Sequence, residues 1–260
     1  EILHRFTPLV ERLSLDEAYL DITGHDGDAA ALAQVIRDLI FQKTKLTASA
    51  GIGPNKLIAK IASDINKPNG QCEVSWNDVP EFLAKLPVRK LWGIGAVTEQ
   101  KLEQLGIKTC ADLQRFSRAE LCDRFGKFGL ELYNQCRGID DRKVEPHHER
   151  KSLSNEQTFS NDLATLEECE ERLAELVEEL IEELGRKAAE RPITKVFVKL
   201  KFNDFSRTTV ERAGLPVAPE SFMTLLNEGF ARTGKPVRLL GVGVRFADDD
   251  PAETTQLALL

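Results

Sequence analysis

The sequence predicts a multidomain α+β protein. Its 260 residues exceed the usual size of one small domain, and 42% of them are hydrophobic, which is enough for more than one packed core. Strand and helix patterns alternate towards both ends of the chain, whereas residues 77–140 carry short helical patterns separated by glycine turns. These observations divide the chain into five segments, which we expect at residues 1–75, 76–140, 141–150, 151–247 and 248–260.

Short strands and two helices are expected in residues 1–75. Apolar residues on either side of an acidic pair predict either two strands of a hairpin or one strand with a bulge. Apolar residues at helical spacing follow Asp28, which is a suitable N-cap, and a later short helix meets the turn formers of residues 66–70. The expected elements are strands at 10–15 and 18–22, a helix after Asp28, a strand at 46–53 and a helix at 56–65.

A βαββαβ order is expected from Lys151 onward. It predicts a split βαβ sheet with both helices on one face. Residues 141–150 precede it; they are polar, contain a proline and lack an apolar period, which favours a linker. The expected helices cover residues 164–190 and 219–231, and the strands centre on Leu153, Val198, Thr209 and Val242.

Composition limits the possible functions only weakly. The net charge is −7, but residues 161–190 alone carry eleven acidic and three basic side chains, which leaves +1 for the rest of the chain. The acidic run is typical of the solvated face of a long helix. The five cysteines form no CxxC pair, which disfavours a zinc site or a disulfide framework and favours a cytoplasmic protein with reduced thiols. No apolar run approaches the ~20 residues that cross a membrane.

Asp16 and Glu17 are the strongest candidates for chemistry. Adjacent carboxylates in an apolar context are costly unless they meet cations, and Mg²⁺ is a usual partner. Two such ions can clamp phosphoryl transfer. Taken alone, the pair is more typical of a solvated turn. Asp21 alternates in phase with Glu17 and is expected to be structural.

Two further patterns indicate phosphate contacts. Lys67 lies in a rigid proline–glycine turn whose free amides suit a triphosphate, although such turns usually only end helices. Gly93 and Gly95, followed by a helix over residues 96–105, have the form of a helix–hairpin–helix that contacts a DNA backbone; an ordinary tight turn is the alternative. A second glycine turn, next to Lys127, could act similarly.

Basic residues are expected to gather on one face of the last sheet. Strand alternation places Lys195, Lys199 and Lys201 opposite a buried row, and we expect no acidic neighbours there. Such a face suits DNA binding without sequence preference, whereas the alternative is a solvated edge that prevents aggregation. Further basic residues of the neighbouring strands are Arg207, Arg212 and Arg245.

The C-terminal residues form a short apolar tail. Terminal residues are usually disordered, but an apolar peptide can dock into a groove of a partner protein. The residues concerned are Gln256, Leu257, Ala258, Leu259 and Leu260.

In this order along one chain, these motifs resemble those of the Y-family translesion DNA polymerases. The resemblance covers essentially the whole chain, and its first three blocks are highly specific. The matching blocks are residues 14–21 (SLDEAYLD), 47–53 (TASAGIG), 57–64 (LIAKIASD), 66–71 (NKPNGQ), 93–95 (GIG), 124–129 (RFGKFG) and 199–202 (KLKF).

The resemblance implies the later part of a palm in residues 1–75, a thumb in 76–140 and a little finger in 151–247. Asp16 and Glu17 would be two of three carboxylates that hold two Mg²⁺ ions, and Lys67 would contact a deoxynucleoside triphosphate. The thumb glycines and the basic residues of the little finger would hold primer–template DNA. The tail would bind the sliding clamp, and the protein would be a monomer that copies damaged templates by two-metal nucleotidyl transfer.

One departure from the family concerns the start of the chain, which opens on Glu1. The family's N-terminal block, with the first metal aspartate and the fingers, has no match, so we expect the chain by itself to be inactive. Three alternatives stay open at this point. They are a non-catalytic DNA-binding module tethered to the clamp, a helix–hairpin–helix nuclease subunit, and a plain clamp adaptor.

Overall fold

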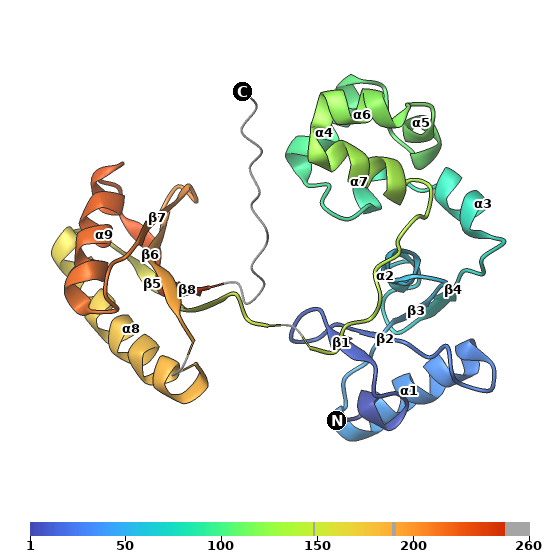
Figure 1. Cartoon of the computed structure of the whole chain (residues 1–260), viewed down its shortest axis with the longest axis horizontal. Coiled ribbons are helices and arrows are strands. Elements are labelled where there is room, and N and C mark those ends of the chain that lie inside the picture. Colours follow the sequence, from blue (N-terminus) through green and yellow to red (C-terminus); the bar gives the residue numbers. More distant parts are fainter. Residues whose placement is uncertain (148, 189–190, 248–260) are drawn as a thin grey trace, which may run out of the picture. The chain divides into compact units, whose positions relative to one another are not determined.

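The computed structural model describes residues 1–147, 149–188 and 191–247. The chain folds into two compact units, Glu1–His148 and Glu149–Leu260 (Figure 1). Each unit has its own hydrophobic core. The boundaries expected from the sequence within these units stay predictions. In the described part of the chain, no helix combines the length and the apolar character that crossing a membrane requires.

The start of the first unit carries two small sheets. Of the two expected arrangements, the structure has the hairpin: β1 (Val10–Arg12) pairs antiparallel with β2 (Ala18–Leu20), although both strands are shorter than expected. The amides of Leu13 and Ser14 both bond to the carbonyl of Glu17, which closes the turn early. The second sheet pairs β3 (Ala50–Ile52) with β4 (Gln71–Glu73) in parallel. The sequence predicts a strand over residues 46–53, but only Ala50–Ile52, near the end of that range, form one.

Helices fill the rest of the first unit. Asp28 caps α1 (Ala29–Thr44) as predicted, by accepting the amide of Ala30. The hydrophobic core of this unit contains buried residues from α2 (Lys56–Ser63) onward as far as Cys136. Since α2 also contacts β3 and β4, this core connects the second sheet to the later helices. Those later elements are α3 (Val79–Ala84), η2 (Val88–Lys90), α4 (Ala96–Gln104), α5 (Cys110–Gln114), α6 (Arg118–Phe125) and α7 (Lys127–Gln135), after an initial turn η1 (Leu3–Arg5).

The second unit has the predicted βαββαβ order. Its sheet runs β5-β8-β6-β7 with antiparallel neighbours, so the parallel strands β5 and β6 are separated by β8, which is the predicted split βαβ arrangement. Both helices cover one face of this sheet (Figure 1). The elements are β5 (Ser152–Leu163), α8 (Leu166–Lys187), β6 (Ile193–Phe202), β7 (Arg207–Ala213), α9 (Pro219–Ala231) and β8 (Val237–Phe246).

The acidic run lies on α8, as expected. This helix turns an apolar stripe towards the sheet, and most of its glutamates are exposed on the opposite side. The other face of the sheet, which carries no helix, is called the open face below. Two glycines of β8, Gly241 and Gly243, lie on it between β5 and β6. A Cβ atom on Gly243 would come within 2.3 Å of the Phe197 ring, so the centre of the open face has no room for side chains on β8.

Candidate active site and nucleic-acid interface

The acidic pair lies at the tip of the β1–β2 hairpin. Asp16 is exposed and accepts a 2.6 Å hydrogen bond from the Ser14 hydroxyl. The same hydroxyl oxygen accepts the amides of Asp16 and Glu17, so Ser14 organises the whole tip. The hydrogen bond from Ser14 is the main reason why the pKa of Asp16 lies below its ordinary value. Asp16 is therefore ionised at neutral pH, as a metal ligand must be.

Three more charged residues surround this tip. Lys60 of α2 donates to Glu17 at 2.6 Å, and Lys67 forms an ion pair with Asp64 at 2.5 Å. The hydrogen bond from Lys67 to Asp64 raises the pKa of Lys67, and the negative charges of Glu17 and Asp16 raise it further. The structure therefore gathers the acidic pair and Lys67, which are about fifty residues apart in the sequence, into one charged cluster.

The chemistry of the acidic pair fits a magnesium ion, but the pair does not complete a site. Carboxylate oxygens are the ligands that Mg²⁺ prefers. Within residues 1–147, 149–188 and 191–247, no three or more His, Cys, Asp or Glu side chains lie close enough together to hold a metal. Asp16 and Glu17 therefore fit as part of a ligand set that other oxygen atoms would complete.

A cavity of about 240 Å³ lies beside this cluster. It carries basic and aromatic groups but also Asp64, and Lys60 connects it to the acidic pair. Burial raises the pKa of the Tyr19 hydroxyl, so this group stays protonated at neutral pH. The lining includes Tyr19, Lys60, Asp64, Lys90, Trp92, Gly93 and Arg142.

Sequence reasoning missed most of this lining. Lys60 could have been found, because a lysine in the apolar helix pattern of residues 56–65 needs a partner. Arg142 and Trp92 come from segments about fifty residues apart, and local spacing carries no signal that brings them together. Asp21, by contrast, accepts the amide and the hydroxyl of Thr23, which fits the structural role expected for it.

The two predicted glycine turns lie next to each other. Gly93 has a φ of +82°, and a Cβ atom there would come within 2.9 Å of Phe128, which follows Lys127 in the first turn of α7. Gly95 caps α4 without a side-chain hydrogen bond, and nothing lies within 4 Å of a Cβ atom built on it. The first amides of α4 have no partner within the helix, so they are suited to an anion. The segment before the hairpin is the 3₁₀ helix η2.

The open face of the sheet is less basic than expected. Lys195 and Lys199 do lie opposite the buried row that contains Val198, as predicted. The expectation that they have no acidic neighbours is wrong, because Lys195 pairs with Glu211 and Lys199 with Glu156, both at 2.7 Å. Strand pairing, which the sequence did not give, places these glutamates on the same face.

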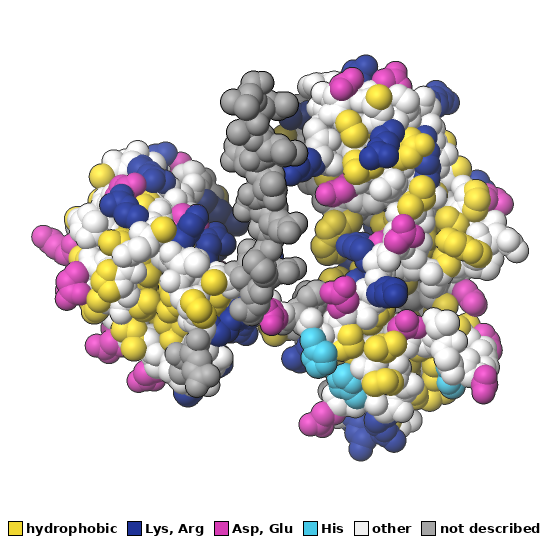
Figure 2. Space-filling model, viewed as in Figure 1, with side chains coloured by type: hydrophobic (Ala, Val, Ile, Leu, Met, Phe, Trp, Pro, Cys, Tyr) yellow, Lys and Arg dark blue, Asp and Glu magenta, His cyan; other side chains and the backbone are white. Residues whose placement is uncertain are grey.

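The remaining cations divide between the two faces. Arg207 lies opposite Lys201 on the open face, and Arg245 lies opposite Lys195 and donates to Glu211. Arg212 instead lies opposite the buried Val196, on the helix-covered side, where it pairs with Glu228 of α9. Basic and acidic side chains are also interspersed on the surfaces that Figure 2 shows, so the charge is locally mixed.

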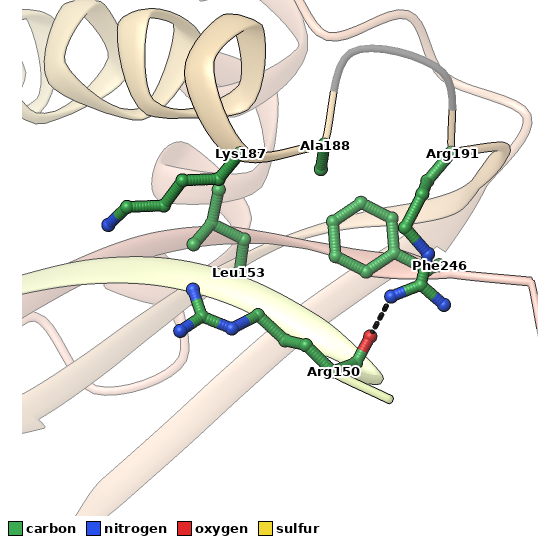
Figure 3. A pocket seen from close by; sticks show the side chains of 6 residues that line it. All are labelled: Arg150, Leu153, Lys187, Ala188, Arg191 and Phe246. Carbon is green, nitrogen blue, oxygen red and sulfur yellow. Dashed lines mark hydrogen bonds between the residues drawn. The ribbon is translucent and has the colours of Figure 1, made fainter. Parts of the chain in front are cut away.

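A second cavity, of about 270 Å³, lies at one end of the second unit (Figure 3). Its floor is apolar, with Leu153 and Phe246, and the Arg191 guanidinium lies over the Phe246 ring at 4.6 Å. Arg150 and Lys187 line it as well. It contains none of the residues predicted to hold metal or nucleotide. The predicted clamp-binding residues Gln256, Leu257, Leu259 and Leu260 lie outside the described residues.

Comparisons with known proteins agree with this arrangement. Residues 1–64 match the model of the impB/mucB/samB family, residues 89–140 match the model "DNA polymerase-iota, thumb domain", and residues 150–259 match the impB/mucB/samB family C-terminal domain. The solved structure of the Y-family DNA polymerase chimera Dbh-Dpo4(243-245)-Dbh aligns with a TM-score of 0.80 and 28% identity, over 94% of this chain and 72% of that chain.

The chain belongs to the Y-family of translesion DNA polymerases, and its enzyme class is DNA-directed DNA polymerase. Similar proteins include DNA polymerase IV of Shewanella frigidimarina (strain NCIMB 400), which is 48% identical over 95% of this chain and 70% of the relative. DNA polymerase IV of Legionella pneumophila (strain Corby) is also 48% identical, over 100% of this chain and 74% of the relative.

Proposed function

We propose that this chain carries part of the active site for two-metal nucleotidyl transfer past damaged template bases. The observation that carries the proposal is the cluster of Asp16, Glu17, Lys60 and Lys67 beside a basic cavity. Magnesium ions held by the two carboxylates would supply positive charge that stabilises the transferring phosphoryl group. The hydrogen bond from Ser14 keeps Asp16 ionised, and Lys60 holds Glu17 in place.

Lys67 binds the triphosphate of the incoming deoxynucleotide in this proposal. Its side chain is about half exposed, and its ammonium group pairs only with Asp64 among the ion pairs that the described residues form, so it can exchange that partner for a phosphate oxygen. The primer 3′-hydroxyl then attacks the α-phosphate, and pyrophosphate leaves. We assign a backbone phosphate of the primer strand to the cavity lined by Lys90, Trp92 and Arg142, because its cations suit an anion.

The test is primer extension by the full-length polymerase that contains this chain. Asp16→Ala and Glu17→Ala should each lower the rate at least about 100-fold, which corresponds to about 2.7 kcal/mol of transition-state stabilisation. Asp21→Ala is the matched control, because Asp21 belongs to the same hairpin but bonds to Thr23. Unchanged extension by the two variants would mean that the hairpin carboxylates are ordinary turn residues.

We also propose that the 260-residue chain by itself does not extend primers. Asp16 and Glu17 supply only two carboxylate ligands, whereas the proposed mechanism needs a third carboxylate to hold the two ions. The purified chain should still bind primer–template DNA, which a fluorescence anisotropy titration would measure. Nucleotide incorporation by the purified chain would contradict this part of the proposal.

DNA is held by the thumb and the little finger in this proposal. The amides at Gly93 and Gly95 contact backbone phosphates, with Lys127 beside them, and the open face contributes its cations without reading bases. The latter are Lys195, Lys199, Lys201, Arg207 and Arg245. We keep the division into a palm segment at 1–75, a thumb at 76–140, a linker at 141–150, a little finger at 151–247 and a tail at 248–260 as part of the proposal.

The tail is proposed to bind the sliding clamp, with the polymerase acting as a monomer in the cytoplasm. The support is the apolar sequence of residues 256–260 and the free thiols of all five cysteines. Deleting residues 256–260 should abolish stimulation by the clamp and leave clamp-free extension unchanged. If clamp-free extension falls equally, the tail has another role.

A further inference from the structure

Arg37 is a buried arginine that connects α1 to the turn that carries Lys67. Its side chain is only 8% exposed, although it is charged. The guanidinium donates five hydrogen bonds. All five acceptors are neutral carbonyl or amide oxygens, so these bonds offset the cost of burying the charge, and no carboxylate is among them. Burying a charged side chain costs desolvation free energy. We therefore ask which segments the hydrogen bonds of Arg37 hold together.

Three of the five hydrogen bonds hold the turn of residues 66–71. One terminal nitrogen of Arg37 donates to the backbone carbonyl of Asn69 at 2.5 Å and to its side-chain oxygen at 2.9 Å. The other donates to the side-chain oxygen of Gln71 at 3.2 Å. Asn69 has a φ of +50°, a left-handed conformation that a non-glycine residue rarely adopts without such support.

The turn is tied down on its other sides as well. The side chain of Asn66 donates to the carbonyl of Gln71 at 2.7 Å, and that of Gln71 donates to the carbonyl of Ala30 on α1. A Cβ atom on Gly70 would come within 2.0 Å of the Asn66 carbonyl oxygen, so the turn is tightly closed. Lys67 lies between these anchored residues, and its direction depends on them.

We infer that Arg37 is a positioning residue for nucleotide binding. It fixes the turn so that the Lys67 ammonium stays at the edge of the Asp16–Glu17 cluster instead of moving with a loose loop. The inference rests on the proposed role of Lys67 in binding the triphosphate. A planar fork of donors is required to hold two turn residues at once, which a lysine at this place could not provide.

The test is the steady-state KM for the incoming nucleotide, measured with the full-length polymerase on a saturating primer–template. Lys67→Ala and Arg37→Gln should each raise this KM about tenfold, because each removes hydrogen bonds made with a charged group. The value of kcat should stay within about twofold, and so should the Kd for primer–template DNA. In the double variant, the effects should overlap instead of multiplying, because both act through one contact.

Two milder variants keep the test independent of folding. Asn69→Gly removes one acceptor of Arg37 while suiting the φ of +50°, and it should raise the nucleotide KM about threefold. Gln34→Ala removes another acceptor of Arg37, one that lies within α1 and not on the turn, and it should leave KM unchanged.

The outcomes separate the inference from the proposed function. If Lys67→Ala raises the nucleotide KM but Arg37→Gln and Asn69→Gly behave like Gln34→Ala, the positioning role is wrong and Lys67 keeps its role. If Lys67→Ala leaves KM unchanged, the nucleotide contact in the proposed function fails, and the role of Arg37 fails with it. A fall in kcat or DNA affinity as large as the rise in KM would make Arg37 a general structural residue and overturn the inference.

Discussion

Ser14 shows how much one hydroxyl group contributes to the acidic tip. It donates to the Asp16 carboxylate and accepts the backbone amides of Asp16 and Glu17. A single side chain thus lowers the pKa of Asp16 and holds the backbone of both acidic residues. Glu17 is restrained separately, by Lys60. The two carboxylates are thus held by different partners, and their roles can be separated by substitution.

Ser14→Ala should raise the pKa of Asp16 towards its ordinary value, because the hydrogen bond that lowers it most is lost. Protonation of Asp16 would then begin at a higher pH than in the wild type. Titration of the Asp16 carboxyl carbon by NMR measures this directly. Ser75→Ala is the control, since Ser75 makes the same 2.6 Å contact to Asp78 elsewhere, and an equal shift of Asp16 in both variants would contradict the assignment.

At the scale of elements, the N-terminus of α2 is held by residues that follow α7 in the sequence. Its own cap Asn55 accepts the amide of Ile58 and donates to the carbonyl of Gly138, and the Asp140 carboxylate accepts the amide of Leu57 at 2.9 Å. Burial opposes ionisation of Asp140, but hydrogen bonds from Arg142 and Leu57 outweigh it and keep its pKa below the ordinary value. The negative charge also suits a helix N-terminus.

Asp140→Ala should lower the free energy of unfolding of the first unit by about 1–2 kcal/mol at pH 7, as loss of a helix cap does. Because the folded-state pKa is lowered, this contribution is present above the ordinary value of 3.8 and is lost as the pH falls below it. Denaturant titrations at pH 7 and pH 3 check both statements. Asp141→Ala, an exposed neighbour, should change little, and an equal loss there would remove the capping explanation.

In the proposed function, ion pairs on the open face should weaken its binding to DNA. Lys199 is bound to Glu156 at 2.7 Å, so a phosphate must compete with a carboxylate for it. Glu156→Gln should therefore tighten primer–template binding about threefold, whereas Lys199→Gln should weaken it and reduce the slope of log K against log salt by about 0.9. Anisotropy titrations at several salt concentrations measure both effects. If Glu156→Gln leaves the affinity unchanged, DNA does not contact this part of the sheet.

Elements with a long apolar period could be predicted from the sequence, but the contacts between distant residues could not. The stripe of α8 and the alternation of β6 specify their own buried faces, so both were found. β1 ends where the amides of Leu13 and Ser14 bond to the Glu17 carbonyl, and β3 is limited to the residues that pair with β4. The apolar pattern sets neither limit. Likewise, Lys60 meets Glu17 across 43 residues, and Arg37 meets Asn69 across 32.

At the scale of the whole molecule, the two units have separate cores. Leu102 belongs to the core of the first unit and Leu200 to that of the second, and both are fully buried. Each core consists of residues of its own unit only. A cavity created in one core should therefore destabilise that unit and leave the stability of the other unchanged. This organisation should be visible in the thermal unfolding of the chain.

We expect differential scanning calorimetry to resolve two transitions. Leu102→Ala and Leu200→Ala should each cost about 2–5 kcal/mol, as buried leucines do, but each should lower the midpoint of only one transition. The two variants serve as controls for each other. A single transition that both substitutions shift equally would mean that the units unfold as one.

The glycines of β8 have a consequence for how a polymerase advances. Gly241 and Gly243 lie at the centre of the open face, where β8 has no side chain that could interlock with base edges. The charged groups lie around this centre, on β5, β6 and β7 and, nearer the end of β8, at Arg245. In the proposed function, a surface of this kind would offer the DNA similar contacts at every position along the strand. Moving forward by one nucleotide would then break no contact that has to be rebuilt in a fixed register, and translocation would meet an almost even energy profile.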